Sequence, residues 1–471
     1  MMLLASSLQA SDKPVAIDGR RELFVDYHLV DRLDGAAMVP ARPRDEGVVF
    51  RFDRPWEGRF CGYTTILRDG ETYRMYYRGL PEAGKDGSNT EVTCVAESND
   101  GIHWTRPKLR LFEVHDTPTN NVVLADHAPF SHNFSPFLDT RPGVPADQRY
   151  KAIAGTSKTG LFVFVSPDGY RWRELNDKPA ITKGAFDSQN VGFWSEAEQC
   201  YLCYFRTWTG GYRRISRTTS KDLLSWTPPV LMEYRQGKEP APLEHLYTNQ
   251  TAPYFRAPHL SMAIAARFLP GRQVISDAQA KAIDVDPGYF RDISDGILMS
   301  TRGGNVYDRT FMEGFVRPDI GLENWVSRTN YPVLGIVQTG PDTMSFYTNC
   351  NYGQPTACLR RYSLRLDGFA SVRAPYEGGE MVTRPLTFQG KRLAVNFATS
   401  AAGGIRIEIQ DAQGKPLPGF ALADSVELIG NEISREATWK GDKTLAELAG
   451  RPVRLRFVLK DADLYAIQFC E

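Results

Sequence analysis

Residues 98–104 read Ser-Asn-Asp-Gly-Ile-His-Trp, and the pattern returns at residues 166–172 as Ser-Pro-Asp-Gly-Tyr-Arg-Trp. A looser copy occupies residues 220–226, and weaker echoes lie at residues 300–307 and 366–369. Asp-Gly is typical of a tight hairpin turn because glycine adopts positive φ without steric cost, so we assign the repeated aspartates to turn structure. Five strand–turn–aromatic units at intervals of roughly 55 to 80 residues predict repeated four-stranded sheets, the pattern of a five-bladed β-propeller.

The repeat stops near residue 375, but the alternation of apolar and polar residues continues towards the C-terminus. Short strands separated by turns that contain Gly and Pro predict a β-sandwich in this region. We therefore expect an all-β protein, a five-bladed β-propeller with a C-terminal β-sandwich. Its parts are a partial signal or leader at residues 1–14, the propeller with an N-terminal lead-in at residues 15–374, and an accessory β-sandwich at residues 375–471.

Composition narrows the classes of partner. The chain of 471 residues carries 56 basic and 56 acidic residues, for a formal net charge of zero. Without a basic stripe, nucleic acid and anionic membrane surfaces are not expected partners. No run approaches the ~20 apolar residues that span a bilayer. Residues 1–10 offer a short apolar stretch and a small-residue cleavage site but no positive n-region, and they favour a secreted or periplasmic protein.

The seven cysteines are scattered, and only Cys200 and Cys203 have the spacing of a metal knuckle. No second pair and no His cluster follows them in the sequence, so we expect neither a metal site nor another cofactor. Most of the cysteines are better explained as small buried apolar residues.

In a propeller, the innermost strands line a central channel, and the loops that enter these strands form a funnel on one face. Several predicted starts of inner strands are unusually polar. Amides, guanidinium groups and imidazole suit a polyhydroxylated ligand, because each buried polar group left unpaired costs about 1–3 kcal/mol. The expected sugar-binding residues are His132, Asn133, Gln189, Asn190, Asn249, Arg78, Arg206, Arg317 and Glu244.

Hydrolysis of a glycosidic bond needs two carboxyl groups across that bond, one protonated and the other acting as nucleophile or as base for water. Asp187, Glu57 and Glu313 lie at or near predicted blade entrances and are the catalytic candidates. Structural alternatives stand beside them: an Asp at a strand start often caps a turn, and Glu57 would also pair with Arg59 on a solvated loop.

Four stretches carry a family resemblance: residues 56–58 (Trp-Glu-Gly), 132–137 (His-Asn-Phe-Ser-Pro-Phe), 187–190 (Asp-Ser-Gln-Asn) and 315–318 (Phe-Val-Arg-Pro). With them, the chain resembles the five-bladed propeller glycoside hydrolases, which include the invertase/levanase-like and arabinanase/xylosidase-like families. It looks closest to a poorly characterised group of exported bacterial proteins. The invertase-type Asn-Asp-Pro-Asn-Gly and Arg-Asp-Pro motifs are absent, so neither fructan cleavage nor individual residue roles carry over.

We therefore expect an exported glycoside hydrolase, exo-acting on a polysaccharide or oligosaccharide. Arg78, Arg206 and Arg317 would equally hold an anionic sugar, since a guanidinium fork matches carboxylate or sulfate oxygens. The alternative from another class is a non-catalytic carbohydrate-binding propeller, which would lack two carboxyl groups about 5–10 Å apart. A lyase or a sulfatase-like hydrolase is a weaker alternative. Lyase chemistry needs a Tyr or His base beside charge-neutralising groups, and the usual sulfatase nucleophile motif is absent.

Overall fold

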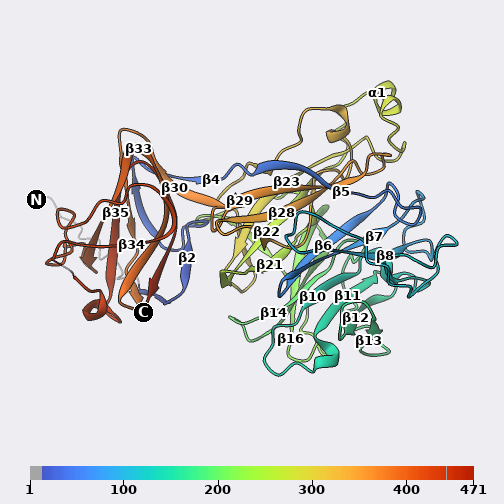
Figure 1. Ribbon diagram of the computed structural model, residues 1–471, viewed down its shortest axis with the longest axis horizontal. Coiled ribbons are helices and arrows are strands. Elements are labelled where there is room, and N and C mark those ends of the chain that lie inside the picture. The colour runs from blue at the N-terminus through green and yellow to red at the C-terminus, as the bar shows by residue number, and fades with distance from the viewer. Residues whose placement is uncertain (1–12, 442) are drawn as a thin grey trace, which may run out of the picture. The chain divides into compact units, whose positions relative to one another are not determined.

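The computed structural model describes residues 13–441 and 443–471, which form two compact units (Figure 1). One unit comprises residues 42–366. The other combines residues 13–41 with residues 367–471, so it is discontinuous in sequence. The leader expected at residues 1–14 falls almost entirely on residues 1–12, which lie outside the described residues.

The first three sheets of the 42–366 unit have four antiparallel strands each, joined in chain order. The first contains β6 (Gly62–Asp69), β7 (Thr72–Gly79), β8 (Val92–Ser98) and β9 (Val122–Leu124). The second contains β10 (Ser135–Leu138), β11 (Tyr150–Thr156), β12 (Gly160–Ser166) and β13 (Arg173–Glu174). The third contains β14 (Val191–Ser195), β15 (Cys200–Thr209), β16 (Tyr212–Ser220) and β17 (Val230–Leu231).

The last two sheets of this unit are larger. The fourth contains β18 (Glu233–Gln236), β19 (Glu239–Pro240), β20 (Leu246–Thr248), β21 (Thr251–Tyr254), β22 (Ala257–Leu269), β23 (Ile293–Thr301), β24 (Val306–Asp308) and β25 (Gly314–Val316). The fifth contains β26 (Tyr331–Pro332), β27 (Val337–Gln338), β28 (Thr343–Cys350), β29 (Cys358–Arg365) and β5 (Arg44–Arg51).

The five sheets follow one another in a closed ring. The innermost strand β10 contacts β6 and β14, β14 contacts β21, β22 contacts β26, and β27 contacts β6. The fifth sheet is completed by β5, the first strand of the unit, which pairs antiparallel with β29 near its end (blue beside orange in Figure 1). This propeller-like arrangement confirms the fold class that the repeated turns predicted.

The repeated Ser-x-Asp segments form the expected turns. Asp100 Oδ1 accepts hydrogen bonds of 2.8 Å from the main-chain N–H groups of Ile102 and His103, and Ser98 Oγ accepts one of 2.9 Å from Gly101. The turns at Asp168 and Asp222 repeat this pattern of main-chain hydrogen bonds to the Asp and Ser side chains. These aspartates are therefore structural.

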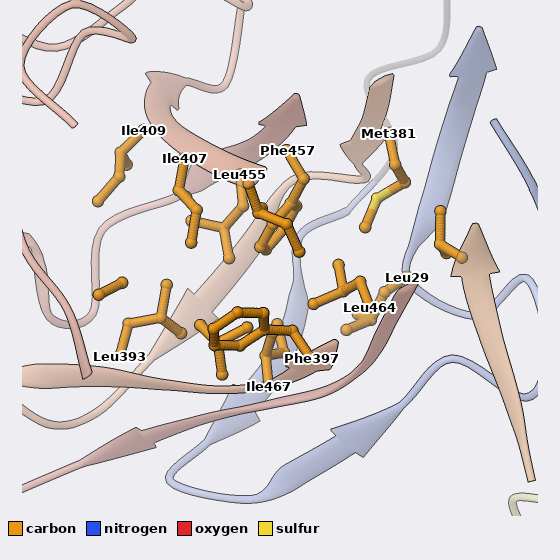
Figure 2. Packing of buried hydrophobic residues seen from close by; sticks show 14 of the residues in the cluster. Leu29, Met381, Leu393, Phe397, Ile407, Ile409, Leu455, Phe457, Leu464 and Ile467 are labelled. Atoms are coloured by element: carbon orange, nitrogen blue, oxygen red, sulfur yellow. The ribbon is translucent and has the colours of Figure 1, made fainter. Parts of the chain in front are cut away.

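The discontinuous unit is built on one ten-stranded sheet. Its strands are β1 (Val15–Asp18), β2 (Arg21–Leu23), β3 (Val30–Asp34), β4 (Ala37–Pro40), β30 (Ala370–Ala374), β31 (Gly379–Thr383), β32 (Leu386–Phe388), β33 (Arg392–Asp411), β34 (Asn431–Ala437) and β35 (Val453–Cys470). Both halves of β33 and β35 supply buried side chains to a single core, among them Phe397, Ile407, Phe457 and Ile467 (Figure 2).

This organisation differs from the expected domain boundaries. Residues 15–41 are not a lead-in to the propeller, because β1, β2, β3 and β4 pair with β32, β35, β31 and β30 in the C-terminal sheet. The boundary between the units falls at residue 366 rather than 374. The strands are linked in one hydrogen-bonded sheet, since β33 and β35 pair with each other on both sides of a register shift, and both halves of this pair face a single core. Alternation identifies a strand but not its partner.

Helical structure is sparse. The α-helix α1 (Asp277–Ala282) begins with a capping box formed by Ser276 and Gln279. Four 3₁₀ turns complete the helical elements of the described residues: η1 (Phe130–His132), η2 (Ala146–Gln148), η3 (Leu322–Asn324) and η4 (Ala446–Leu448). Among the described helices, none has the length and apolar character needed to cross a membrane.

Candidate active site

Side-chain amides tie the innermost strands together in the middle of the ring of sheets. Gln189 Nε2 donates a hydrogen bond of 2.7 Å to Thr65 Oγ1 in β6. Gln250 Nε2 donates bonds of 2.8 Å to Gln189 Oε1 and to the main-chain oxygen of Pro332 in β26. Because these residues belong to or adjoin the inner strands of four sheets, the network closes the middle of the ring. Gln189, expected to bind sugar, is part of this framework.

Residues that come shortly before Thr65, Gln189, Gln250 and Pro332 in the chain belong to a circuit of contacting side chains. We call this circuit the arginine–tyrosine ring: Tyr63, Asp187, Tyr247 and Arg328, with Arg78, Arg206, Arg213 and Tyr352. Tyr63, Arg78, Arg328 and Tyr352 border a small cavity of about 20 Å³, room for one water molecule. The lining residues of this cavity are Gly62, Tyr63, Arg78, Arg328, Tyr331, Asn349 and Tyr352.

One side of the circuit is built around Arg78, at the end of β7, whose guanidinium group is buried. Its Cζ atom lies 5.0 Å from the centre of the Tyr63 ring, and Nη2 donates a bond of 2.9 Å to the Tyr352 hydroxyl. Nη1 lies 3.1 Å from His132 Nδ1 and 3.3 Å from Asp86 Oδ1. The structure thus brings the predicted residues Arg78 and His132 together, and it adds Asp86, whose side chain is 42% exposed.

The opposite side of Tyr63 meets Asp187, at the entrance to β14. The Tyr63 hydroxyl donates a bond of 3.1 Å to the main-chain oxygen of Asp187. The Asp187 carboxylate pairs with the buried Arg206, and the Asp187 side chain is nevertheless 60% exposed. Of the three predicted catalytic carboxylates, Asp187 is the one that the structure places in the circuit, with its oxygens open to solvent.

Tyr247, in β20, is packed against three guanidinium groups. Its ring centre lies 4.9 Å from Arg206 Cζ, 5.4 Å from Arg213 Cζ and 5.6 Å from Arg328 Cζ. Burial alone would raise the pKa of the Tyr247 phenol, but the charges of Arg328 and Arg206 outweigh burial and lower it. Burial and the neighbouring Arg206 charge together lower the pKa of Arg213. This side of the circuit is therefore strongly electropositive.

Four residues with unusual backbone conformation lie in or beside the circuit. Tyr63, Gln250, Arg328 and Asn330 have φ values of 49°, 51°, 55° and 56°, in the left-handed region that favours glycine. A side chain in this region costs on the order of 1–3 kcal/mol, and the strain persists only where the surrounding structure holds it. Strained residues often occur at ligand sites, and two of these four, Tyr63 and Arg328, line the cavity.

Asp86, Glu91 and His132 are the group of described residues whose ligand atoms are close enough to hold a metal ion, within 4.8 Å of one another. Arg78 Nη1 lies 3.3 Å from the carboxylates and 3.1 Å from the imidazole. The guanidinium group thus already supplies these residues with a positive charge. In this arrangement the cluster holds the Arg78 guanidinium group in the circuit.

Glu57 is buried away from any substrate, so its catalytic assignment is not supported. Its carboxylate accepts hydrogen bonds of 2.7 and 2.8 Å from Arg106 and one of 2.6 Å from the Tyr77 hydroxyl, with none of the side chain exposed. The expected pair with Arg59 does not form; Arg59 instead binds Asp284. An ion pair with an arginine that is distant in the sequence leaves no local sequence signal. The sequence therefore contains no sign that the Glu57 carboxylate is already paired and buried.

The predicted amides are structural as well. Asn133, Asn190 and Asn249 are buried, and each side-chain N–H group donates to main-chain carbonyl oxygens of neighbouring loops or strands. They fix the backbone that leads into the inner strands. The polar strand starts were correctly located, but most of their amides satisfy the protein's own backbone.

Three further candidates lie on the fourth sheet outside the circuit. Glu244 pairs with Arg267 at 2.8 Å and with Arg309 at 2.7 Å, and these charges hold the pKa of Glu244 below its ordinary value against the opposing effect of burial. Glu313 and Arg317 are exposed on either side of β25. Within the described part of the chain, no hydrogen bond or ion pair joins these three to the arginine–tyrosine ring.

The sequence did not single out Asp86, Tyr63, Tyr247, Arg213 or Arg328. Each belongs to a different loop or strand end, and their meeting depends on closure of the ring of sheets. A signal was present for two of them. Tyr247 precedes the polar pair 248–249 directly, and Arg328 stands in the polar run that leads to β26.

Comparisons with known proteins return only distant structural likenesses. No family model and no curated protein matches the chain. A solved glycoside hydrolase has 9% identity and a TM-score of 0.44, covering 69% of this chain and 92% of its own. A fructofuranosidase from Schwanniomyces occidentalis has 10% identity and a TM-score of 0.38, covering 89% and 96%. A β-1,2-mannobiose phosphorylase from Listeria innocua has 11% identity and a TM-score of 0.40, covering 70% and 95%.

At these identities and TM-scores the likenesses carry no argument about chemistry. Strand pairing and the site geometry define the class by themselves: an all-β protein with a propeller-like ring of sheets, whose inner strand ends carry a cationic and aromatic site. The resemblance to propeller glycoside hydrolases is a likeness in architecture.

Proposed function

We propose that this protein is a glycoside hydrolase in which Asp187 and Asp86 are the two catalytic carboxyl groups. The observation that carries the proposal is their shared setting on Tyr63. Each is a partly exposed carboxylate held by a buried arginine: Arg206 for Asp187, Arg78 for Asp86. The Tyr63 ring packs on Arg78, and its hydroxyl bonds to Asp187. One tyrosine side chain therefore connects the surroundings of both groups.

In the proposed reaction, one carboxyl group gives its proton to the glycosidic oxygen as the bond to the anomeric carbon breaks. The other, as carboxylate, either attacks the anomeric carbon or takes a proton from the attacking water. The products are two saccharides, and one water is consumed. Asp187 keeps the catalytic role that the sequence predicted for it. Asp86 takes the second catalytic role, for which the sequence offered Glu57 or Glu313.

Exo action is the mode that the framework favours. The amide network of Gln189 and Gln250 closes the middle of the ring of sheets, and the cavity beside it is small. A site that is blind at its inner end accepts the end of a chain more readily than its middle. We therefore propose release of short products from the end of a polysaccharide or oligosaccharide.

The test is hydrolysis of plant and algal oligosaccharides, neutral and anionic, by the full chain and by Asp187→Asn and Asp86→Asn. Each substitution is expected to lower kcat by about 10²- to 10⁴-fold, the usual contribution of a positioned acid or base. On a substrate with a good leaving group, the variant that lacks the acid should recover most of its rate, which identifies the acid.

Glu313→Gln is the matched control, an exposed carboxylate outside the circuit, and it should leave kcat unchanged. Unchanged activity in both aspartate variants would refute the assignment. Binding of saccharides by every variant without product from the unaltered protein would support the alternative, a non-catalytic carbohydrate-binding propeller.

A further inference from the structure

The arginine–tyrosine ring has more positive charge on one side than its carboxylates balance. Arg206, Arg213 and Arg328 all pack on Tyr247, and Asp187 pairs with Arg206 alone. Arg213 and Arg328 form no ion pair with any carboxylate of the described residues. Both side chains are partly buried, and a bound anion would offset the cost of keeping their charges partly out of water.

Unpaired polar atoms lie at the same place. Arg206 Nε, Arg213 Nε and the Tyr331 hydroxyl are buried and have no hydrogen-bond partner. Tyr331 is 6% exposed and lines the small cavity together with Arg328. Buried polar atoms are nearly always paired in folded proteins, so the Tyr331 hydroxyl, in a residue that lines the cavity, is a candidate to bond an acceptor oxygen of a ligand.

We propose that Arg213 and Arg328 form a subsite for an anionic group, a carboxylate or a sulfate ester, carried by the saccharide. That the anionic group belongs to a saccharide rests on the proposed function. That the subsite binds an anion follows from the charges of the ring and the unpaired polar atoms beside it. A guanidinium group presents parallel N–H donors that match two oxygens of either group. Arg317, expected to share this role, follows β25 of the fourth sheet and does not take part.

Aromatic faces next to these arginines suit a sugar ring rather than a free inorganic anion. Trp208, at the end of β15, is 53% exposed and its ring lies 4.6 Å from Arg213 Cζ. Tyr289 lies 4.8 Å from Arg328 Cζ on the other side. An aromatic face covers the apolar face of a pyranose while the charged group reaches the guanidinium pair.

The experiment is calorimetric titration of the full chain at constant ionic strength with glucuronic acid, galactose sulfate, galactose and inorganic sulfate. The anionic saccharides should bind, and galactose should bind more weakly. Arg213→Gln and Arg328→Gln should each weaken anionic binding about 10- to 100-fold, the loss of one charge-assisted hydrogen bond. Arg317→Gln is the matched control, an exposed arginine outside the ring, and should change nothing.

Arg328→Lys keeps the charge but removes the fork, so intermediate affinity is expected; circular dichroism checks that each variant is folded. Tighter binding of glucuronic acid assigns a uronate, and tighter binding of galactose sulfate assigns a sulfate ester. The proposal is overturned if neither anionic saccharide binds, if galactose binds equally well, or if the arginine variants bind like the unaltered protein. Arginine-dependent binding without hydrolysis of any saccharide would refute the proposed function but support the anion subsite.

Discussion

Asp187 and Glu57 are both acidic residues at predicted blade entrances, but their surroundings in the structure are opposite. Asp187 is open to solvent beside Arg206, whereas Glu57 is fully enclosed by Arg106 and Tyr77. A catalytic carboxylate has to reach its substrate, so accessibility separates the two before any argument about chemistry. Their difference also predicts different consequences of substitution.

Glu57→Gln is expected to lower the free energy of unfolding by about 3–5 kcal/mol, because it removes the buried carboxylate of the ion pair and leaves Arg106 only the exposed Asp53. Urea denaturation measures the change. Glu313→Gln, at an exposed glutamate, should be neutral in the same assay. A stable Glu57→Gln protein that has lost hydrolysis would return Glu57 to the catalytic list.

Tyr247 is expected to ionise below the ordinary phenol value of 10.0, since Arg328 and Arg206 favour the phenolate more than burial opposes it. Because its pKa is lower in the folded than in the unfolded protein, its contribution to stability grows as pH rises through the folded pKa. That contribution is lost again as pH falls through the same value. Ultraviolet difference titration of the protein against Tyr247→Phe measures the step.

Inorganic sulfate in the same titration should move the Tyr247 step upwards, because a bound anion offsets the guanidinium charges that favour the phenolate. Tyr27→Phe, which removes an exposed tyrosine, should leave the step in place. A step at or above the ordinary value would show that burial, not the arginines, dominates around Tyr247.

Among the elements, β5 has the largest effect on the ring of sheets, since it supplies the last strand of the fifth sheet. Phe50, in β5, is 6% exposed and its ring centre lies 5.6 Å from that of Tyr77 in the first sheet. Phe50→Ala should cost about 3–5 kcal/mol of unfolding free energy, measured by urea denaturation. Val48→Ala, at an exposed position of the same strand, is the control and should cost little.

The elements also show how far the sequence alone can go. The turns at residues 98–104 and 166–172 were predictable because Asp-Gly and a following Trp determine local geometry within seven residues. The pairing of β5 with β29 was not, since alternation in either strand says nothing about a partner on the far side of the unit. For the same reason the sequence predicted Arg78 at the end of a strand and His132 before one, but their contact, and that of Tyr247 with Arg328, depends on ring closure.

At the scale of the whole molecule, the strand pairing of the 42–366 unit is self-contained. Every strand of the five sheets finds its partners within residues 42–366, and the arginine–tyrosine ring lies entirely in that range. A chain of residues 42–366 is therefore expected to fold alone, with a cooperative thermal transition by circular dichroism, and to bind the same anionic saccharides.

The other unit should not tolerate loss of its N-terminal part. Without residues 1–41, the sheet lacks β1, β2, β3 and β4, and the edges of β30, β31 and β32 are uncovered. Limited proteolysis of such a chain should cut residues 367–471 faster than in the full chain. Equal protection would show that β33 and β35 suffice to hold this unit together.

The position of β5 has a consequence for synthesis on the ribosome. Asp45 in β5 bonds to Arg360 in β29, which is 315 positions later. At about 5–20 residues per second, β5 leaves the ribosome roughly a quarter of a minute to a minute before its partner strand exists. During that interval it is an unpaired edge, and its charged residues, Arg44, Asp45, Glu46 and Arg51, oppose association with the nascent strands of neighbouring chains. The ring of sheets is thus the last structure of the 42–366 unit to be completed, and the saccharide site can assemble only after translation has passed β29.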